Sequence, residues 1–110
     1  MLIDKNLNLC ITENIMNPMD YIEKISENDI ILLDNYFKTK GWEEPYGDEF
    51  LQKMLKKFDG QNMKIVCISD RGKRLCEWYD GWKEANEKRW IQGWCTEKNG
   101  KEIYRFLKKL

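Results

Sequence analysis

Apolar residues in the first half of the chain recur mostly at helical spacing. Residues 7–12 partly alternate between apolar and polar side chains, which predicts a short strand. Asn17 and Pro18 are typical of a helix start, because Asn caps the first turn and Pro fits its first position. Two further apolar stripes, in residues 26–37 and 50–58, predict a second and a third helix.

The pattern changes to that of strands in the second half. Residues 63–68, with the sequence MKIVCI, form a compact apolar run that predicts a strand. Residues 70–73 have the composition of a turn, which lets residues 74–79 return as an antiparallel partner strand.

The C-terminal residues have two interpretations. Asn99 and Gly100 favour a type I′ hairpin turn, because both tolerate positive φ. This hairpin would place Trp94 opposite Arg105, close enough for a cation–π contact. The alternative is a helix over residues 101–110, whose apolar side would consist of Ile103, Phe106, Leu107 and Leu110. We prefer the hairpin.

The segment from residue 76 to residue 95 contains four of the five tryptophans. A single helix over this segment would include Gly81 and Gly93, each of which costs about 1 kcal/mol in a helix interior. We therefore predict two strand-like ends around a short helical or looped centre at residues 82–88.

These elements predict an α+β fold in which residues 1–110 form a single domain. A short N-terminal strand and two to three helices are expected to pack on a C-terminal antiparallel sheet of three to four strands.

Composition indicates a folded protein outside the membrane. Hydrophobic residues make up 42% of the 110 residues and charged residues 35%, and no apolar run approaches the roughly 18 residues of a spanning helix. The first ten residues lack the basic start and apolar stretch of a signal peptide. We therefore expect a cytoplasmic protein with no membrane partner.

The residue types exclude several chemistries. Histidine is absent, which excludes histidine-dependent triads and imidazole zinc ligands. The four cysteines, at positions 10, 67, 76 and 95, include no close pair and are more typical of small buried residues than of a metal or disulfide framework. No Walker A loop, dinucleotide fingerprint or GxSxG motif is present. We predict no catalytic residue, no metal and no cofactor, and we favour a non-enzymatic protein.

Charge divides the chain into halves of opposite sign. Residues 1–60 hold 7 basic and 12 acidic residues, a net charge of −5, and residues 61–110 hold 12 basic and 7 acidic residues, a net charge of +5. Attraction between the halves within one domain is the simpler explanation, and two faces for different partners is the alternative. An acidic loop supplies candidate partner-binding residues: Trp42, Glu43, Glu44, Asp48 and Glu49.

A second candidate site combines aromatic and cationic side chains. Such a combination can stack and neutralise a nucleic acid or a nucleotide, although a net charge of zero is poor for a dedicated nucleic-acid binder. The candidate platform residues are Arg74, Trp78, Trp82, Arg89, Trp90, Trp94 and Arg105. Packing of most of these tryptophans in the core is the competing interpretation.

Small size, the lack of catalytic groups and the divided charge lead to one main hypothesis. The chain is predicted to be a small, non-enzymatic, intracellular module that binds a protein partner. Its many Lys, Ile and Asn codons indicate an AT-rich genome, which suggests a phage- or mobile-element-type inhibitor of a host system. A nucleic-acid or nucleotide binder is the alternative, and the sequence leaves the oligomeric state open.

Overall fold

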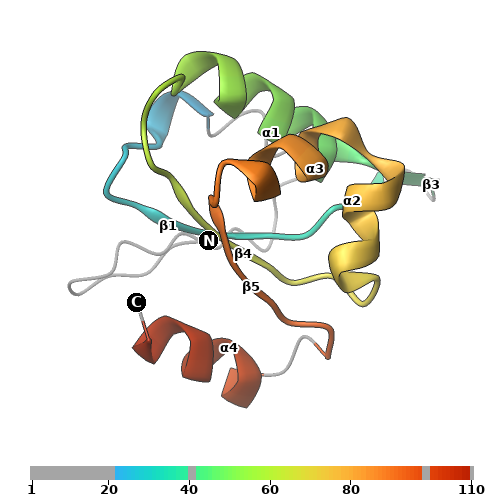
Figure 1. Ribbon diagram of the computed structural model, residues 1–110. Helices are drawn as coiled ribbons and strands as arrows, with labels where there is room; N and C mark the ends of the chain where they lie inside the picture. Colours follow the sequence, from blue (N-terminus) through green and yellow to red (C-terminus); the bar gives the residue numbers. More distant parts are fainter. Residues whose placement is uncertain (1–21, 40–41, 98–99, 110) are drawn as a thin grey trace.

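A three-stranded parallel sheet lies at the centre of the structure, a computed structural model (Figure 1). The strand order is β1-β4-β5, with β1 at Ile30–Leu33, β4 at Lys64–Cys67 and β5 at Ile91–Trp94. Both β1 and β5 pair with β4 in the parallel sense. The antiparallel C-terminal sheet predicted from the sequence is therefore wrong.

The structure describes residues 22–39, 42–97 and 100–109, and it describes no side chain at residues 37–39, 42 or 43. The predicted strand at residues 7–12 and the predicted helix start at Asn17 and Pro18 lie outside the described residues.

Helical segments connect the parallel strands. Between β1 and β4 lie a small antiparallel pair, β2 (Phe37–Thr39) and β3 (Trp42–Glu44), and helix α1 (Tyr46–Lys57). Between β4 and β5 lie the 3-10 helix η2 (Gly72–Arg74) and helices α2 (Leu75–Trp78) and α3 (Asp80–Glu87). Helix α4 (Gly100–Lys108) follows β5.

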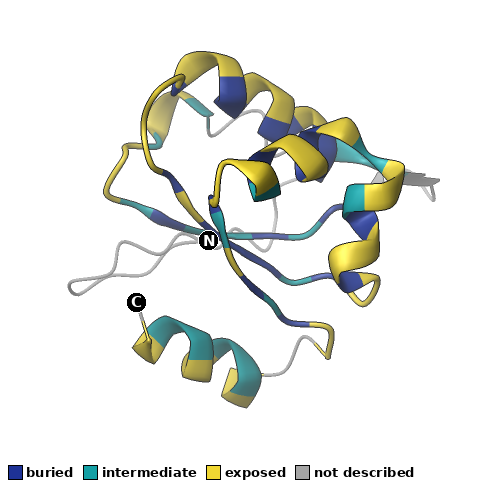
Figure 2. Cartoon of the chain, viewed as in Figure 1, coloured by how far each residue is buried: buried dark blue, intermediate teal, exposed yellow. Residues whose placement is uncertain are grey.

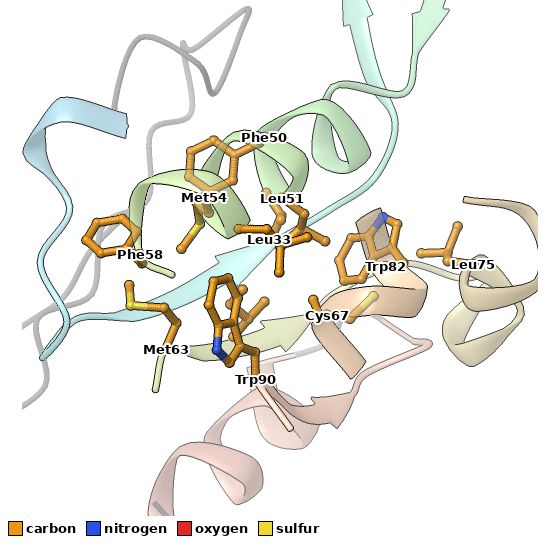
Figure 3. Packing of buried hydrophobic residues seen from close by; sticks show 13 residues of the cluster. Leu33, Phe50, Leu51, Met54, Phe58, Met63, Cys67, Leu75, Trp82 and Trp90 are labelled. Carbon is orange, nitrogen blue, oxygen red and sulfur yellow. The ribbon is translucent and has the colours of Figure 1, made fainter. Parts of the chain in front are cut away.

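Helices α1 and α3 cover one face of the sheet (Figure 1). Successive side chains on a strand point to opposite faces, so Ile31 and Leu33 of β1 and Ile65 and Cys67 of β4 point towards these helices. The main core forms between the layers and is drawn in Figures 2 and 3. Its largest fully buried members are Trp82, Trp90, Phe50, Leu51, Met54, Met63, Ile65 and Leu75.

Helix α4 covers the opposite face of the sheet. The other side chains of the strands, including Ile30 and Val66, contact its half-buried residues Ile103, Phe106 and Leu107. Gly93 of β5 makes this contact close, because a Cβ atom at that position would collide with the ring of Phe106. Gly93, the second glycine of the tryptophan-rich segment, therefore lies in a strand against which the Phe106 ring packs.

The predicted hairpin around Asn99–Gly100 is wrong, because the C-terminal residues form α4. The competing helix is the interpretation that the structure supports, since Ile103, Phe106 and Leu107 all face the sheet. Leu110 lies outside the described residues. The Trp94–Arg105 contact, which depended on the hairpin, is lost with it.

The predicted helix over residues 26–37 is also wrong. Asp29 Oδ2 accepts a hydrogen bond from the Ser26 N–H at 2.9 Å and the Asp29 N–H donates to the Ser26 carbonyl oxygen at 3.0 Å, so residues 26–29 form a tight turn that leads into β1. The apolar run of β1 is covered on both faces, and such strands resemble buried helical segments in sequence.

Several local predictions are confirmed, and one more is wrong. The third helix is α1, and the strand predicted at residues 63–68 is β4. The centre of the tryptophan-rich segment is α3, and its far end is β5. Residues 74–79 do not return as a strand, because η2 and α2 occupy this part of the chain.

Candidate functional site

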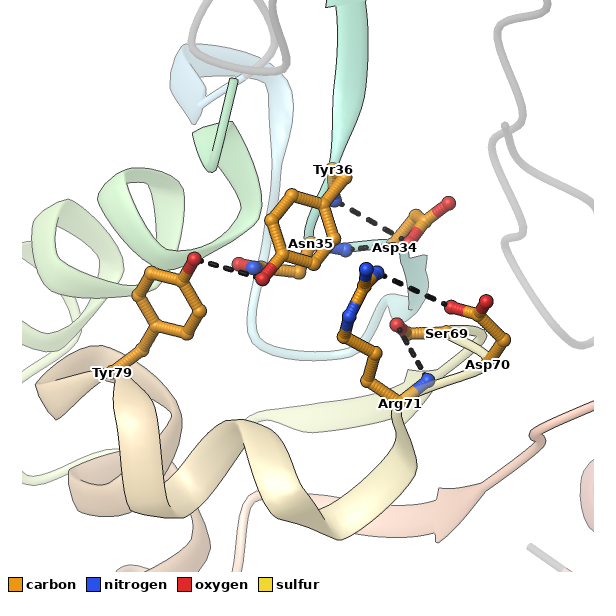
Figure 4. A network of polar contacts seen from close by, with 7 residues as sticks. All are labelled: Asp34, Asn35, Tyr36, Ser69, Asp70, Arg71 and Tyr79. Atoms are coloured by element: carbon orange, nitrogen blue, oxygen red, sulfur yellow. Dashed lines mark hydrogen bonds and ion pairs between the residues drawn. The ribbon is translucent and has the colours of Figure 1, made fainter. Parts of the chain in front are cut away.

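The carboxyl ends of β1 and β4 meet at one edge of the sheet because the strands are parallel. Asp34, Asn35 and Tyr36 follow β1, and Ser69, Asp70 and Arg71 follow β4 after one intervening residue. In open α/β sheets, ligands bind outside the carboxyl ends of the strands. This edge is therefore the first place to examine for a functional surface (Figure 4).

Two tyrosines and an arginine form the centre of the edge. The hydroxyl oxygens of Tyr36 and Tyr79 are 2.8 Å apart and share a hydrogen bond. The two rings meet edge to face, with their centroids 6.1 Å apart. The Arg71 guanidinium lies over the Tyr36 ring, 4.6 Å from its centroid, in a cation–π contact. Its Nη1 is also 3.7 Å from Asp70 Oδ1.

Backbone hydrogen bonds hold the turn that positions Arg71. Buried Ser69 accepts the Arg71 N–H on its Oγ at 3.3 Å and the Gly72 N–H on its carbonyl oxygen at 3.0 Å. Gly72 has φ +55°, a left-handed conformation that side-chain-bearing residues rarely adopt. A Cβ atom there would also lie 2.9 Å from Thr96 Cγ2. The backbone of this turn therefore requires glycine at position 72.

Below the tyrosines, buried Asn35 connects three elements. Its Oδ1 accepts hydrogen bonds from the backbone N–H of Asp48 in α1 at 3.0 Å and from Trp82 Nε1 in α3 at 2.8 Å. Because both partners are donors, the oxygen and nitrogen of the amide are assigned unambiguously. The Nδ2 atom of Asn35 has no hydrogen-bond partner among the described residues.

Burial and a neighbouring hydroxyl keep the Tyr36 hydroxyl protonated. Burial raises the pKa of Tyr36 above its usual value of 10.0, and the Tyr79 hydroxyl raises it further. Arg71 and the Asn35 amide act in the opposite direction on this pKa, because each favours a negative charge on the phenol oxygen. The Tyr36 hydroxyl is therefore protonated at neutral pH.

The structure separates the residues of the predicted acidic loop. Trp42 and Glu43 lie in β3, where the side chains are not described, and Glu44 is half-buried at the end of that strand. Asp48 and Glu49 lie in the first turn of α1, so most of the predicted loop has regular structure. Among the carboxylates of this loop whose side chains the structure describes, only Glu49 is exposed.

Asp48 has a structural role. It is 7% exposed, and its Oδ1 accepts the Gly81 N–H at 2.7 Å while its Oδ2 accepts Gln52 Nε2 at 2.7 Å. This carboxylate thereby joins the N-terminal turns of α1 and α3, and a negative charge is favourable near a helix N-terminus.

The clustered tryptophans have different environments. Trp82 and Trp90 are 0% and 1% exposed, so neither offers a ring face to a ligand. Trp94 is half-buried and lies 5.9 Å from Trp82 between ring centroids. Trp78, at the end of α2, is 52% exposed.

The three arginines predicted for the platform are all exposed but lie on different elements. Arg74 ends η2, Arg89 follows α3 with φ 63°, and Arg105 lies on α4, across the sheet from α3. Arg74 alone is near an exposed tryptophan, because Arg74 and Trp78 are one helical turn apart.

The described cysteines are free thiols. Burial raises the pKa of Cys67 from 9.0 to about 12 and that of Cys95 from 9.0 to about 11, and it also raises the pKa of Cys76. A raised pKa means little thiolate at neutral pH, which disfavours nucleophilic chemistry at these positions. In the described ranges, no group of three or more cysteines and carboxylates is placed to hold a metal ion.

Sequence reasoning missed the residues that the structure brings together at the carboxyl edge. Tyr36 was assigned to a helix, and Tyr79 is 43 residues away from it in the chain. The available signal was the polar sequence Asp34-Asn35 directly after a buried apolar run, which is typical of the end of a parallel strand.

Comparisons with known proteins add no family: no protein-family model matches the chain, and searches of curated proteins and solved structures gave no significant match. Within the part of the chain that the structure describes, no helix has both the length and the apolar character needed to cross a membrane.

Proposed function

We propose that this chain is a protein-binding module that docks through the carboxyl edge of its sheet. The binding surface consists of Tyr36, Arg71, Arg74, Trp78 and Tyr79, which we call the edge surface. The observation that carries the proposal is the half-exposed Trp78, next in the chain to the Tyr36–Tyr79–Arg71 cluster.

The residue types at the edge surface support a protein partner. Trp, Tyr and Arg are the residues most enriched among those that contribute most of the binding energy at protein interfaces. An exposed tryptophan can bury a large apolar area when a partner covers it. The tyrosine rings are held by their shared hydrogen bond and by Arg71, so little side-chain entropy remains to be lost on binding.

The nucleic-acid alternative has less support. Two of its four candidate tryptophans are buried in the core, and Arg89 and Arg105 lie at other elements than Arg74. A net charge of zero also gives little of the electrostatic attraction on which nucleic-acid binding depends. The finer hypothesis of a phage-type inhibitor rests on the coding bias alone and stays a prediction.

Site-specific photo-crosslinking tests the proposed function. A photoreactive phenylalanine analogue replaces Trp78 in one variant and exposed Lys53 of α1 in a matched control, and each is irradiated in cells of the source organism. We expect one protein to be crosslinked from position 78 and not from position 53. Excess wild-type chain should compete for this product, and excess Trp78→Ala chain should not. The absence of any protein specific to position 78 would overturn the proposal.

A further inference from the structure

We propose that the protein partner presents an acidic segment, whose carboxylates are bound by the basic turn Arg71, Lys73 and Arg74 beside Trp78. This inference rests on the proposed function and specifies the chemistry of the partner. It reverses the expectation from the sequence, in which the carboxylates of this chain were the binding groups.

The cations of the basic turn are available to a partner. Among the described residues, neither Lys73 nor Arg74 forms an ion pair, and both side chains are exposed. Within the described ranges, the one ion pair of Arg71 is with Asp70, at 3.7 Å, and the Asp70 side chain is 71% exposed. An exposed pair of this length contributes little, so a partner's carboxylate can replace Asp70 at small cost.

The turn holds the backbone of these cations in place. Ser69 and Gly72 determine this backbone, and Gly72 packs against Thr96, two residues after β5. Because the backbone is ordered before binding, less entropy is lost when the partner arrives. Arg74 and Trp78 lie one turn apart, so a carboxylate and a neighbouring apolar group of one segment can reach both.

The groups behind the basic turn are donors as well. In the Tyr36–Tyr79 pair one hydroxyl donates to the other, which leaves one O–H free to donate elsewhere. The buried Nδ2 of Asn35 is an unpartnered donor beside this pair (Figure 4).

The charges around the basic turn favour a partner with separate carboxylates over a partner with a phosphate backbone. Residues 69–80 contain three cations, Arg71, Lys73 and Arg74, and three anions, Asp70, Glu77 and Asp80, so 3 − 3 gives a local net charge of zero. A nucleic acid has a continuous line of negative charge, which would meet these anions as well as the cations. An acidic protein segment can place each carboxylate opposite one cation.

Charge reversal at the turn tests the inference against a matched control. One variant combines Arg71→Glu, Lys73→Glu and Arg74→Glu, and the control combines Lys53→Glu, Lys56→Glu and Lys83→Glu at exposed positions on α1 and α3. Both have the same change in net charge. We expect the turn variant to lose crosslinking from position 78 by about tenfold or more, which corresponds to about 1.4 kcal/mol, while the control retains it.

A milder variant and a direct binding measurement distinguish a loss of binding from a loss of the fold. The combination Arg71→Gln, Lys73→Gln and Arg74→Gln should also lose crosslinking, with a circular dichroism spectrum equal to that of the wild type. In nuclear magnetic resonance titrations at low salt, an oligoglutamate peptide should shift the amide signals of residues 71–74 and the Trp78 indole signal. An oligolysine peptide of the same length should not.

The possible failures are distinguishable. If position 78 crosslinks no protein, the proposed function fails and the inference fails with it. If crosslinking persists in the charge-reversed turn variant, or if oligoglutamate shifts none of the named signals, only the acidic-partner inference is overturned. A larger shift of the same signals by an oligothymidylate of equal length would also overturn it and would favour a nucleic-acid partner.

Discussion

At the residue scale, Asn35 determines how β1, α1 and α3 meet. One buried oxygen accepts hydrogen bonds from Asp48 and from Trp82, which belong to two different helices. An apolar side chain at this position would leave both donors buried without an acceptor, and each such donor costs about 1–3 kcal/mol. Asn35 is therefore central to the stability of the edge surface as well as to its shape.

We expect Asn35→Ala to lower the free energy of unfolding by about 2–4 kcal/mol, because two buried donors lose their acceptor. Urea unfolding followed by tryptophan fluorescence measures this change. The control is a double-mutant cycle with Trp82→Phe, which removes one donor. The two substitutions should be non-additive by about 1 kcal/mol. Strict additivity would contradict the Asn35–Trp82 hydrogen bond.

The buried thiols make stability fall with rising pH. The thiols of Cys67 and Cys95 have pKa values of about 12 and about 11 in the folded state, against 9.0 when unperturbed. The unfolded chain therefore releases these protons first, so the stabilisation is complete below pH 9 and is lost as the pH rises towards the folded values. At pH 10 the loss should be about 1 kcal/mol for each thiol.

Urea midpoints under reducing conditions at pH 8 and pH 10 test this expectation. The variant Cys67→Ala should show a smaller decrease between the two pH values than the wild type, although it is less stable at both. Equal decreases in the two proteins would show that Cys67 does not contribute to the pH dependence.

At the element scale, the docking of α4 depends on the absence of a side chain at Gly93. The Phe106 ring occupies the space that a Cβ atom would need. None of the α4 residues is fully buried, so its attachment to the sheet rests on the half-buried Ile103, Phe106 and Leu107. A small change at the contact should therefore have a measurable effect.

We expect Gly93→Ala to destabilise the protein by about 1–3 kcal/mol, because the new methyl group displaces the Phe106 ring. Thermal unfolding by circular dichroism measures the effect. Replacing the ring by a smaller side chain in Phe106→Ala should remove most of the cost of Gly93→Ala. If the cost is the same in both backgrounds, the contact between Gly93 and Phe106 is not its cause.

The elements that the sequence predicted correctly are those whose pattern is local. Helix α1 has apolar residues on one side and lysines on the other, and β4 is a short apolar run that ends before a turn. In contrast, the direction in which strands pair is decided by contacts between distant residues. The run Ile30–Leu33 is covered by α1 and α3 on one side and by α4 on the other, which removes the alternation that would have identified it as a strand.

The edge surface was beyond sequence reasoning for a related reason. Tyr36 and Tyr79 become neighbours only because the parallel sheet brings the ends of β1 and β4 together. Trp78 has an exposed ring and Trp82 is buried, and the sequence could not separate the two. The hydrogen bond between Trp82 and Asn35, 47 residues apart, decides that difference.

At the scale of the whole molecule, few ion pairs among the described residues join the two oppositely charged halves. Of the three ion pairs between the described residues, only Lys88–Asp59 joins the halves, and Lys57–Glu23 and Arg71–Asp70 each lie within one half. Each is 3.7 Å long and has a largely exposed carboxylate, so each contributes little to stability. The ion pairs among the described residues therefore contribute little to attraction between the halves.

This distribution predicts that salt affects binding much more than folding. Between low salt and about 0.5 M NaCl, screening should weaken the exposed pairs only slightly, so the melting temperature should change by no more than about 2–4 °C. Crosslinking from position 78 should fall severalfold over the same range, because the cations of the basic turn act on a partner's carboxylates across an exposed surface. A melting temperature that falls steeply with salt, together with unchanged crosslinking, would indicate the opposite: the charges of this chain would then serve its own folding, and an apolar contact at Trp78 would account for binding.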